Sequence, residues 1–194
     1  MPVTEAPSTA PADSRPATEA SLTSASAEAE TNPASAAPAF DQKITFIGDS
    51  IAIDVAPDLE SHYANIGVDG KVSRQFAAAS QIVSGYVAAN KLGDIVVIEL
   101  GSNGPFSASN MRSLIELAGP DRAIYFVNTN VPRSWCPVIN NTIASVAAEY
   151  PNVQVIDWYG ASAGHSEYFG KDAVHPNAAG SAAMAALVEQ AIEG

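Results

Sequence analysis

Cysteine and histidine are scarce in this chain of 194 residues. The single Cys136 excludes a disulfide bond within the chain, although this says little about the compartment. A metal site needs several His, Cys or carboxylate ligands clustered at short spacing. One cysteine and three scattered histidines do not supply such a cluster, so we expect neither a bound metal nor another cofactor.

Basic residues are also few, since nine Lys and Arg stand against 21 Asp and Glu, for a net charge of −12. Five of these acids and one of these bases lie in the first 40 residues, which leaves 16 acids, eight bases and a net charge of −8 for the remainder. Binding to nucleic acid or to anionic lipid needs basic patches. The sequence offers none, so we expect no nucleic-acid partner.

Long apolar runs are missing as well. No segment approaches the roughly 18 apolar residues of a membrane span, and no apolar signal-peptide core follows Met1. Residues 1–40 are mostly Ala, Ser, Thr, Pro and Glu. Such a segment buries too little surface to offset its ordering entropy. We therefore predict a disordered linker over residues 1–40 and one folded domain over residues 41–194. The composition is typical of a linker between a membrane part and an outer domain, and a dispensable terminus is the alternative.

The rest of the chain alternates short apolar runs with longer helical patterns. The runs expected as strands cover residues 44–47, 64–72, 94–100, 123–127 and 153–157. The segments expected as helices cover residues 51–63, 76–92, 107–118, 138–150 and 177–192. This alternation predicts parallel βαβ units and a three-layer α/β sandwich.

Polar residues follow several of these strands, and they include the parts of a nucleophilic site. Gly48-Asp49-Ser50 follows the first strand, Gly101-Ser102-Asn103 follows the third, and Asp172-Ala173-Val174-His175 follows the fifth. Serine becomes a good nucleophile when a histidine takes its proton and a carboxylate orients that histidine. Each block alone could be a turn or a helix cap. Together they converge on the carboxyl edge of the sheet, where ligands bind in open parallel folds.

These three blocks resemble those of the SGNH (GDSL-like) hydrolase superfamily, and the likeness covers residues 43–192. The resemblance implies a flavodoxin-like α/β/α sandwich with a five-stranded parallel sheet. It also implies that Ser50 is the nucleophile, His175 the general base and Asp172 its orienting acid. The oxyanion would bind to the Asn103 side chain and the backbone N–H of Ser50.

One block departs from the superfamily pattern. A glycine usually offers its backbone N–H to the oxyanion there, and the matching residue is Ser73. A serine can offer the same N–H, but its allowed backbone angles are narrower. Gly104 departs too, because an Asp often stands at this place. The neighbouring Arg74 is interpreted as structural, as are His62, His165 and the buried filler Cys136.

Gly104, the segment Arg133-Ser134-Trp135 and Trp158-Tyr159 resemble a narrower group, the extracellular SGNH domains fused to membrane acyltransferase-3 proteins, notably peptidoglycan O-acetyltransferases. The resemblance implies a location at the extracellular or cell-envelope face and a membrane acyltransferase domain as supplier of acetyl groups. Trp135 could face a sugar ring and Arg133 could bind a carboxylate. A packed loop with one exposed charge is the alternative.

The functional prediction is a serine-dependent O-acetyltransferase that moves acetyl to a cell-wall glycan hydroxyl through an acyl-enzyme. The acceptor expected from the resemblance is muramic acid of peptidoglycan. The alternative is a carbohydrate or acetyl esterase that hydrolyses short-chain esters with the same residues. A catalytically silent glycan-binding module is a minor alternative, which the intact set of Ser, His and Asp disfavours.

Overall fold

The computed structural model describes residues 40–194, so the linker predicted over residues 1–40 lies, but for Phe40, outside the described residues. The strands are β1 (Ile44–Gly48), β2 (Ile66–Gly70), β3 (Ile95–Glu99), β4 (Ala123–Val127) and β5 (Val153–Ile156). The α-helices are α1 (Ser50–His62), α2 (Ala79–Ala88), α3 (Ala108–Ala118), α4 (Cys136–Ala147), α5 (Trp158–Ala161) and α6 (Ala178–Glu193). Two 3₁₀ turns cover Phe76–Ala78 and Ser166–Tyr168. Within residues 40–194, no helix has the length and apolarity that crossing a bilayer requires.

The five strands form one parallel sheet in the order β2-β1-β3-β4-β5. The expected α/β fold with a five-stranded parallel sheet is therefore confirmed. The chain leaves β1 toward β2 on one side and later returns to β3 on the other. The carboxyl ends of β1 and β3 thus flank the point where the strand order reverses, which is where ligands bind in such sheets.

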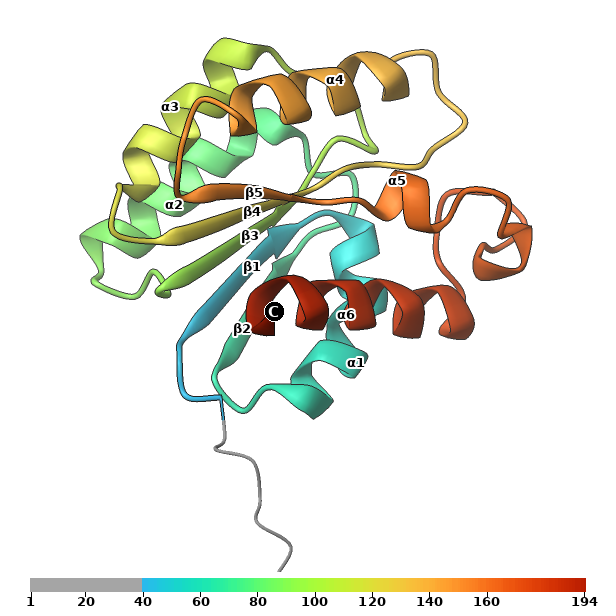
Figure 1. Cartoon of the computed structure of the whole chain (residues 1–194), viewed down its shortest axis with the longest axis horizontal. Helices are drawn as coiled ribbons and strands as arrows, with labels where there is room; N and C mark the ends of the chain where they lie inside the picture. Colours follow the sequence, from blue (N-terminus) through green and yellow to red (C-terminus); the bar gives the residue numbers. More distant parts are fainter. Residues whose placement is uncertain (1–39) are drawn as a thin grey trace, which may run out of the picture. The chain divides into compact units, whose positions relative to one another are not determined.

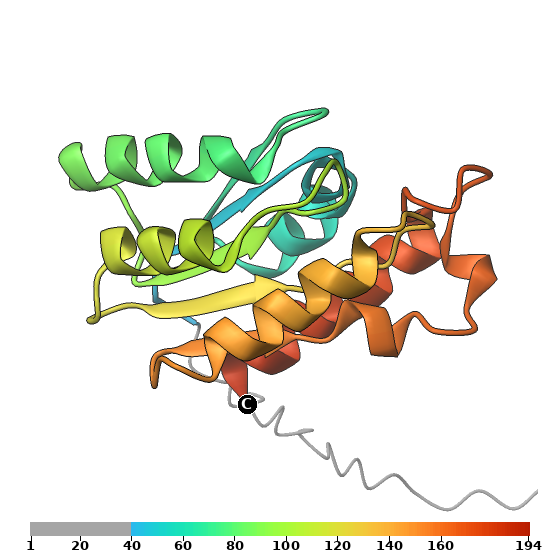
Figure 2. The same cartoon turned by 90° about the horizontal axis from the view of Figure 1, so that it is seen from above.

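Helices cover both faces of the sheet. Helices α1 and α6 lie on one face, and α2, α3 and α4 lie on the other (Figures 1 and 2). Strands β1 and β3 are buried along their whole length, as expected for strands covered on both sides. Their side chains alternate: Phe46 and Val97 pack toward α1 and α6, whereas Ile47 and Ile98 pack toward α2, α3 and α4.

Several helical boundaries differ from the sequence prediction, most of all in α2 and α4. The helix expected over residues 76–92 is a 3₁₀ turn followed by α2, and it ends at Ala88, before Gly93. Asn90 adopts a left-handed φ of 51°, and the Lys91 N–H donates to the Tyr86 carbonyl at 2.8 Å, so a Schellman-type cap stops the helix early. Helix α4 begins two residues early, at Cys136, with Pro137 in its first turn. Helix α5 was not predicted from the sequence.

Candidate active site

Ser50 lies in a tight turn between the first strand and the first helix. Strand β1 ends at Gly48 and helix α1 begins at Ser50, so only Asp49 separates them. The Asp49 side chain caps the helix by accepting a hydrogen bond from the Ile51 N–H at 3.0 Å. A side chain at Gly48 would collide with the Cβ atom of Ala52 and with Glu99, so this turn requires glycine. The result is a half-buried Ser50 hydroxyl at the carboxyl edge of the sheet.

His175 connects Ser50 to Asp172 through two hydrogen bonds. Its Nε2 lies 2.9 Å from the Ser50 Oγ, and its Nδ1 lies 2.6 Å from Asp172 Oδ2. The other Asp172 oxygen accepts the backbone N–H groups of Val174 and His175, at 3.0 and 3.1 Å. Ala173 takes a left-handed φ of 55° that turns the loop back on itself. The sequence-predicted Ser, His and Asp are thus brought together over a separation of 125 residues.

The electrostatics of these groups follow from their hydrogen bonds. The bond to His175 and the two backbone N–H groups lower the pKa of Asp172, so it is a carboxylate at neutral pH. That carboxylate in turn raises the pKa of His175, with smaller contributions from the charges of Asp54 and Asp49. The imidazole is therefore a stronger base than usual, and this arrangement can accept a proton from the Ser50 hydroxyl.

Asn103 lies in the loop after β3, and its side chain is anchored beside the Ser50 turn. Its Nδ2 donates to Asp49 Oδ2 at 2.8 Å, and its backbone carbonyl accepts from Gln75 Nε2 at 2.5 Å. Nδ2 also lies 3.4 Å from the Ser102 Oγ, which is a long contact. A side-chain amide carries two N–H groups, so one of them can be given to a ligand while the other stays on Asp49. Gly104 follows with a φ of 154°, and the Gln75 side chain occupies the place that a Cβ atom at Gly104 would take. Gly104 therefore has a packing reason to lack a side chain.

Ser73 lies in the exposed turn after β2, and its φ of 60° is in the left-handed region that favours glycine. The glycine-like backbone of this position is thus kept, although the residue is serine. The adjacent Arg74 has a structural role within the described part of the chain. Its guanidinium donates to the Gly48 carbonyl at 2.9 Å and pairs with Asp69 at 2.6 Å, so it ties the ends of β1 and β2 together.

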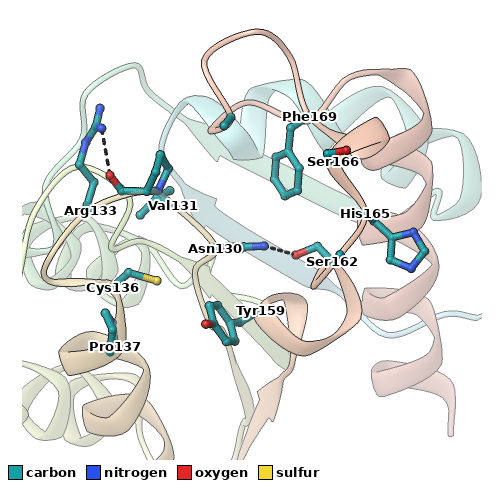
Figure 3. A pocket seen from close by; sticks show the side chains of 13 residues that line it. Asn130, Val131, Arg133, Cys136, Pro137, Tyr159, Ser162, His165, Ser166 and Phe169 are labelled. Carbon is teal, nitrogen blue, oxygen red and sulfur yellow. Dashed lines mark hydrogen bonds between the residues drawn. The ribbon is translucent and has the colours of Figure 1, made fainter.

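Arg133 and Trp135 lie in the loop between β4 and α4, in different surroundings. The Trp135 indole N–H donates to the Gly101 carbonyl at 3.1 Å, and its ring packs against the core. Arg133 is exposed, and within the described residues its guanidinium donates only to the adjacent Pro132 carbonyl, at 3.3 Å. Arg133 lines an open cavity of about 600 Å³, and Trp135 does not (Figure 3).

This cavity lies between the loop after β4 and the segment from α5 to the Asp172–His175 loop. Asn130 and Ser162 join the two sides through a hydrogen bond of 2.8 Å (Figure 3). Tyr159 and Phe169 contribute aromatic rings, and Ala173 connects the cavity to the loop that carries His175. The full lining is Asn130, Val131, Pro132, Arg133, Cys136, Pro137, Tyr159, Ser162, Gly164, His165, Ser166, Phe169 and Ala173.

The remaining candidates for chemistry lie apart from Ser50. His165 is exposed and bonds to Glu167 at 2.7 Å, and His62 bonds to Glu193 at 2.9 Å. Cys136 is buried, and its thiol donates to the Thr129 carbonyl. Among residues 40–194, no group of three His, Cys, Asp or Glu side chains is arranged to hold a metal ion.

Sequence reasoning missed two carboxyl groups near the site. Glu99 is 4 % exposed at the end of β3, and burial with the nearby Asp49 charge raises its pKa well above the usual range. Asp54 has an unpartnered buried oxygen, and burial raises its pKa. A signal existed for Glu99, because it is the one charged residue in an otherwise apolar strand. Asp54 lies on a helix with ordinary polar spacing, so no comparable signal marked it.

Sequence comparison relates the chain to part of larger proteins. No protein-family model matches it. It is 43% identical over 143 residues to the peptidoglycan O-acetyltransferase OatA of Listeria monocytogenes, and 40% identical over 148 residues to the O-acetyltransferase OatA of Staphylococcus aureus. These matches cover 73% and 76% of this chain, but only 22% and 24% of the relatives. The chain thus spans about a quarter of the curated relatives' length.

Structural comparison agrees with the predicted fold. The C-terminal catalytic domain of Streptococcus pneumoniae peptidoglycan O-acetyltransferase A matches with a TM-score of 0.70 at 21% identity, over 78% of this chain and 92% of that one. A member of the lipolytic G-D-S-L family from Veillonella parvula matches with a TM-score of 0.64 at 18% identity, over 78% and 98%. The expected resemblance to SGNH hydrolases, and to peptidoglycan O-acetyltransferases among them, is therefore confirmed.

Proposed function

From this fold and this homology to one segment of peptidoglycan O-acetyltransferases, we propose that residues 41–194 form a catalytic domain that transfers acetyl groups to a cell-wall glycan. The observation that carries the proposal is the hydrogen-bonded chain from Ser50 through His175 to Asp172, at 2.9 and 2.6 Å. The acceptor is a hydroxyl of peptidoglycan, by analogy with the names of the relatives.

In the first half of the reaction, Ser50 takes the acetyl group from an ester or thioester donor. His175 Nε2 accepts the serine proton while the Ser50 Oγ attacks the acetyl carbonyl carbon. The negative charge moves to the carbonyl oxygen, which the second N–H of Asn103 and the backbone N–H of Ser50 stabilise. Ser73 is a third candidate donor through its backbone N–H. The intermediate then expels the donor's oxygen or sulfur, which leaves with the proton from His175, and acetyl-Ser50 remains.

In the second half, the acceptor hydroxyl replaces the donor. His175 removes the hydroxyl proton, the acceptor oxygen attacks the acetyl carbonyl carbon, and Ser50 leaves and recovers its proton. Throughout both halves, Asp172 keeps the imidazole in the tautomer whose Nδ1 carries hydrogen and stabilises the imidazolium. No net proton is gained or lost when acetyl moves between two hydroxyl groups.

A transferase must also favour a sugar hydroxyl over water, which it does by holding the acceptor in line with the carbonyl. We assign this role to the cavity beside Ala173. The guanidinium of its Arg133 forms no ion pair within residues 40–194, and this positive charge is suited to the lactyl or peptide carboxylate of muramic acid. Tyr159, 47 % exposed, offers an aromatic face for a sugar ring. Trp135 contributes indirectly, by supporting the Gly101 loop from which Asn103 and Gly104 follow.

The chain corresponds to about a quarter of its relatives, so the wider assembly is also part of the proposal. A membrane acyltransferase domain would supply the acetyl donor, and the linker over residues 1–40 would connect the two. The site would then act at the extracellular or cell-envelope face, where peptidoglycan lies.

Hydrolysis is the second candidate, because water has free access to the site. The side chains of His175 and Asp172 are 43 % and 52 % exposed, and no described segment covers them. An acetyl-enzyme left without an acceptor would therefore react with water. The same three residues would then make the protein an esterase.

The test is to incubate residues 41–194 with a chromogenic acetyl ester, with and without muroglycan oligomers. Transfer predicts acetylated oligomers and faster consumption of the donor when they are present. Rapid release of free acetate, with no oligomer acetylated across a panel of glycans, would favour the esterase. No turnover under any condition would favour the remaining alternative, a catalytically silent glycan-binding module.

Substitutions in the loop between β4 and α4 make this test more specific. Arg133→Ala should lower transfer to muroglycan more than hydrolysis, and Trp135→Ala should lower both, since it loosens the Asn103 loop. Arg112→Ala is the matched control, because Arg112 is exposed and pairs with Glu149 away from the cavity. Equal losses of transfer and hydrolysis in Arg133→Ala would remove Arg133 from acceptor binding.

A further inference from the structure

Two buried carboxyl groups lie at the Ser50 turn, and the proposed reaction gives neither of them a role. Asp49 is fully buried and Glu99 is 4 % exposed. Asp49 directly follows β1 and Glu99 ends the neighbouring β3, where it is in register with Gly48. Two adjacent carboxylates without a cation repel each other strongly when buried. The described neighbours include no such cation at this pair, so one of the two must keep its proton.

The hydrogen bonds around the pair identify which one. Asp49 accepts bonds from the Ile51 N–H at 3.0 Å, from the Asn103 amide at 2.8 Å and from the Ser102 hydroxyl. Three donors stabilise its charged form. Glu99 is 4 % exposed and accepts the Asp49 N–H at 3.3 Å, and burial beside the Asp49 charge raises its pKa well above the usual range. We therefore assign the proton of the pair to Glu99, which can donate it in a hydrogen bond to the neighbouring Asp49 carboxylate.

We propose that Glu99, as a neutral carboxylic acid, is a positioning residue that holds Asp49 and, through Asp49, aims the Asn103 amide at the oxyanion. The inference rests on the proposed function, since it concerns the stabilisation of the same intermediate. One N–H of Asn103 is fixed by Asp49 Oδ2, so the direction of the other depends on where that carboxylate stands. The backbone N–H of Asp49 donates to the Glu99 carboxyl group, and the Asp49 side chain accepts from the Ile51 N–H, so both the backbone and the side chain of Asp49 are held in place.

The substitution Glu99→Gln tests the neutral form directly. A glutamine keeps the shape, its carbonyl can accept the Asp49 N–H, and its NH₂ can donate to the Asp49 carboxylate. We expect this variant to keep kcat for acetyl-ester hydrolysis within about threefold of the parent. Glu99→Met keeps a similar volume without hydrogen bonds, and it should lower kcat by at least tenfold with KM nearly unchanged. The upper bound is the loss of one oxyanion donor, about 10²–10³.

A double-mutant cycle separates positioning from general stability. If Glu99 acts through Asn103, Glu99→Met should cost less than twofold further in an Asn103→Ala background, because the group it aims is already gone. An equal cost in both backgrounds, or a Glu99→Gln loss as large as that of Glu99→Met, would overturn the proposal. Melting temperatures of all variants identify any that do not fold.

An infrared measurement tests the protonation state without any activity. The parent at neutral pH should show the carbonyl band of a buried protonated carboxylic acid, and Glu99→Gln should remove it. Absence of that band would overturn the assignment even if the enzyme is active. If instead the band is present but Ser50→Ala retains full turnover, the proposed function fails while the state of Glu99 stands.

Discussion

In the proposed reaction, Ser50 depends on its neighbours for reactivity, and the distances around it indicate what each neighbour would supply. His175 lies 2.9 Å from its oxygen and can take its proton, and Asp172 holds the imidazole at 2.6 Å. Asn103 reaches the same turn through Asp49. These groups act as a unit, so the effects of removing them are not additive.

The first prediction concerns these side chains. Ser50→Ala and His175→Ala should each abolish almost all acetyl-ester turnover, with melting temperatures close to that of the parent, because both side chains lie at the surface of the site. Asp172→Asn should fold but lose about 10⁴ in kcat, since an amide no longer selects the imidazole tautomer. Steady-state kinetics and thermal melts check both parts. Full turnover by Ser50→Ala would mean that another nucleophile is used.

The second prediction is a pH profile. His175 must be neutral to act as a base, and its pKa is raised above 6.5 by the Asp172 hydrogen bond and by the charges of Asp54 and Asp49. The kcat/KM value should therefore rise with pH through a midpoint above 6.5. Asp54→Asn removes one negative charge, so the midpoint should move to lower pH. Glu60→Gln, a charge change on the exposed part of the same helix, is the control. A shift in the opposite direction, or an equal shift in both variants, would contradict this account.

The turns between elements determine where the chemistry lies. Gly48 and Asp49 join β1 to α1 with no spare residue, and this turn sets the direction of Ser50. Arg74 supports it from the turn after β2, where it donates to the Gly48 carbonyl and pairs with Asp69. Because the side chain of Arg74 is only 8 % exposed, its loss would leave both partners poorly satisfied.

The third prediction follows from that support. Arg74→Met should keep the aliphatic packing but lower the free energy of unfolding by about 1.5–3 kcal/mol, the range for hydrogen bonds to charged groups. Denaturant titration measures this change. Arg112→Met, at the exposed pair with Glu149, should change it much less, because water and salt screen that pair. Equal effects of the two substitutions would show that the Arg74 contacts do not stabilise the turn.

Across the domain, the parallel sheet brings together residues that are far apart in the chain. All five strands run in the same direction, so the loops after β1, β3, β4 and β5 meet at one edge. Residues 41–194 carry a net charge of −8, from 16 acids and eight bases, and Arg133 places one of these positive charges in the cavity. The described core lies entirely within residues 44–188.

The fourth prediction concerns the N-terminal segment. Phe40 packs against the core beside α1 and α6 and contacts the Tyr63 ring edge to face, so the truncation must keep it. A protein that starts at Phe40 should melt at the same temperature as the full chain and keep the same acetyl-ester kinetics, because residues 1–39 carry too few apolar side chains to pack on the domain. Calorimetry on the two proteins checks this. A clear drop in melting temperature after truncation would show that the segment packs against the domain.

Residue patterns alone predicted the fold class, the approximate places of the five strands and the blocks that contain Ser50, Asp172 and His175. They could do so because strands buried on both faces are continuously apolar, and because polar residues at strand ends are conspicuous between such runs. Helix ends were less predictable, as at Asn90, where a left-handed cap replaced the expected stop at Gly93.

Which side chains share a local environment depends on tertiary contacts, and these could not be predicted from residue patterns. The register of β1 with β3 places Glu99 beside Asp49, and no sequence spacing reports a strand register. Likewise, the cavity of Arg133 and Tyr159 forms because two loops separated in the chain close against each other. Side-chain direction also separated Trp135, which packs inward, from Arg133, two residues away. Such differences depend on packing across the sheet edge, a long-range property that local residue patterns do not carry.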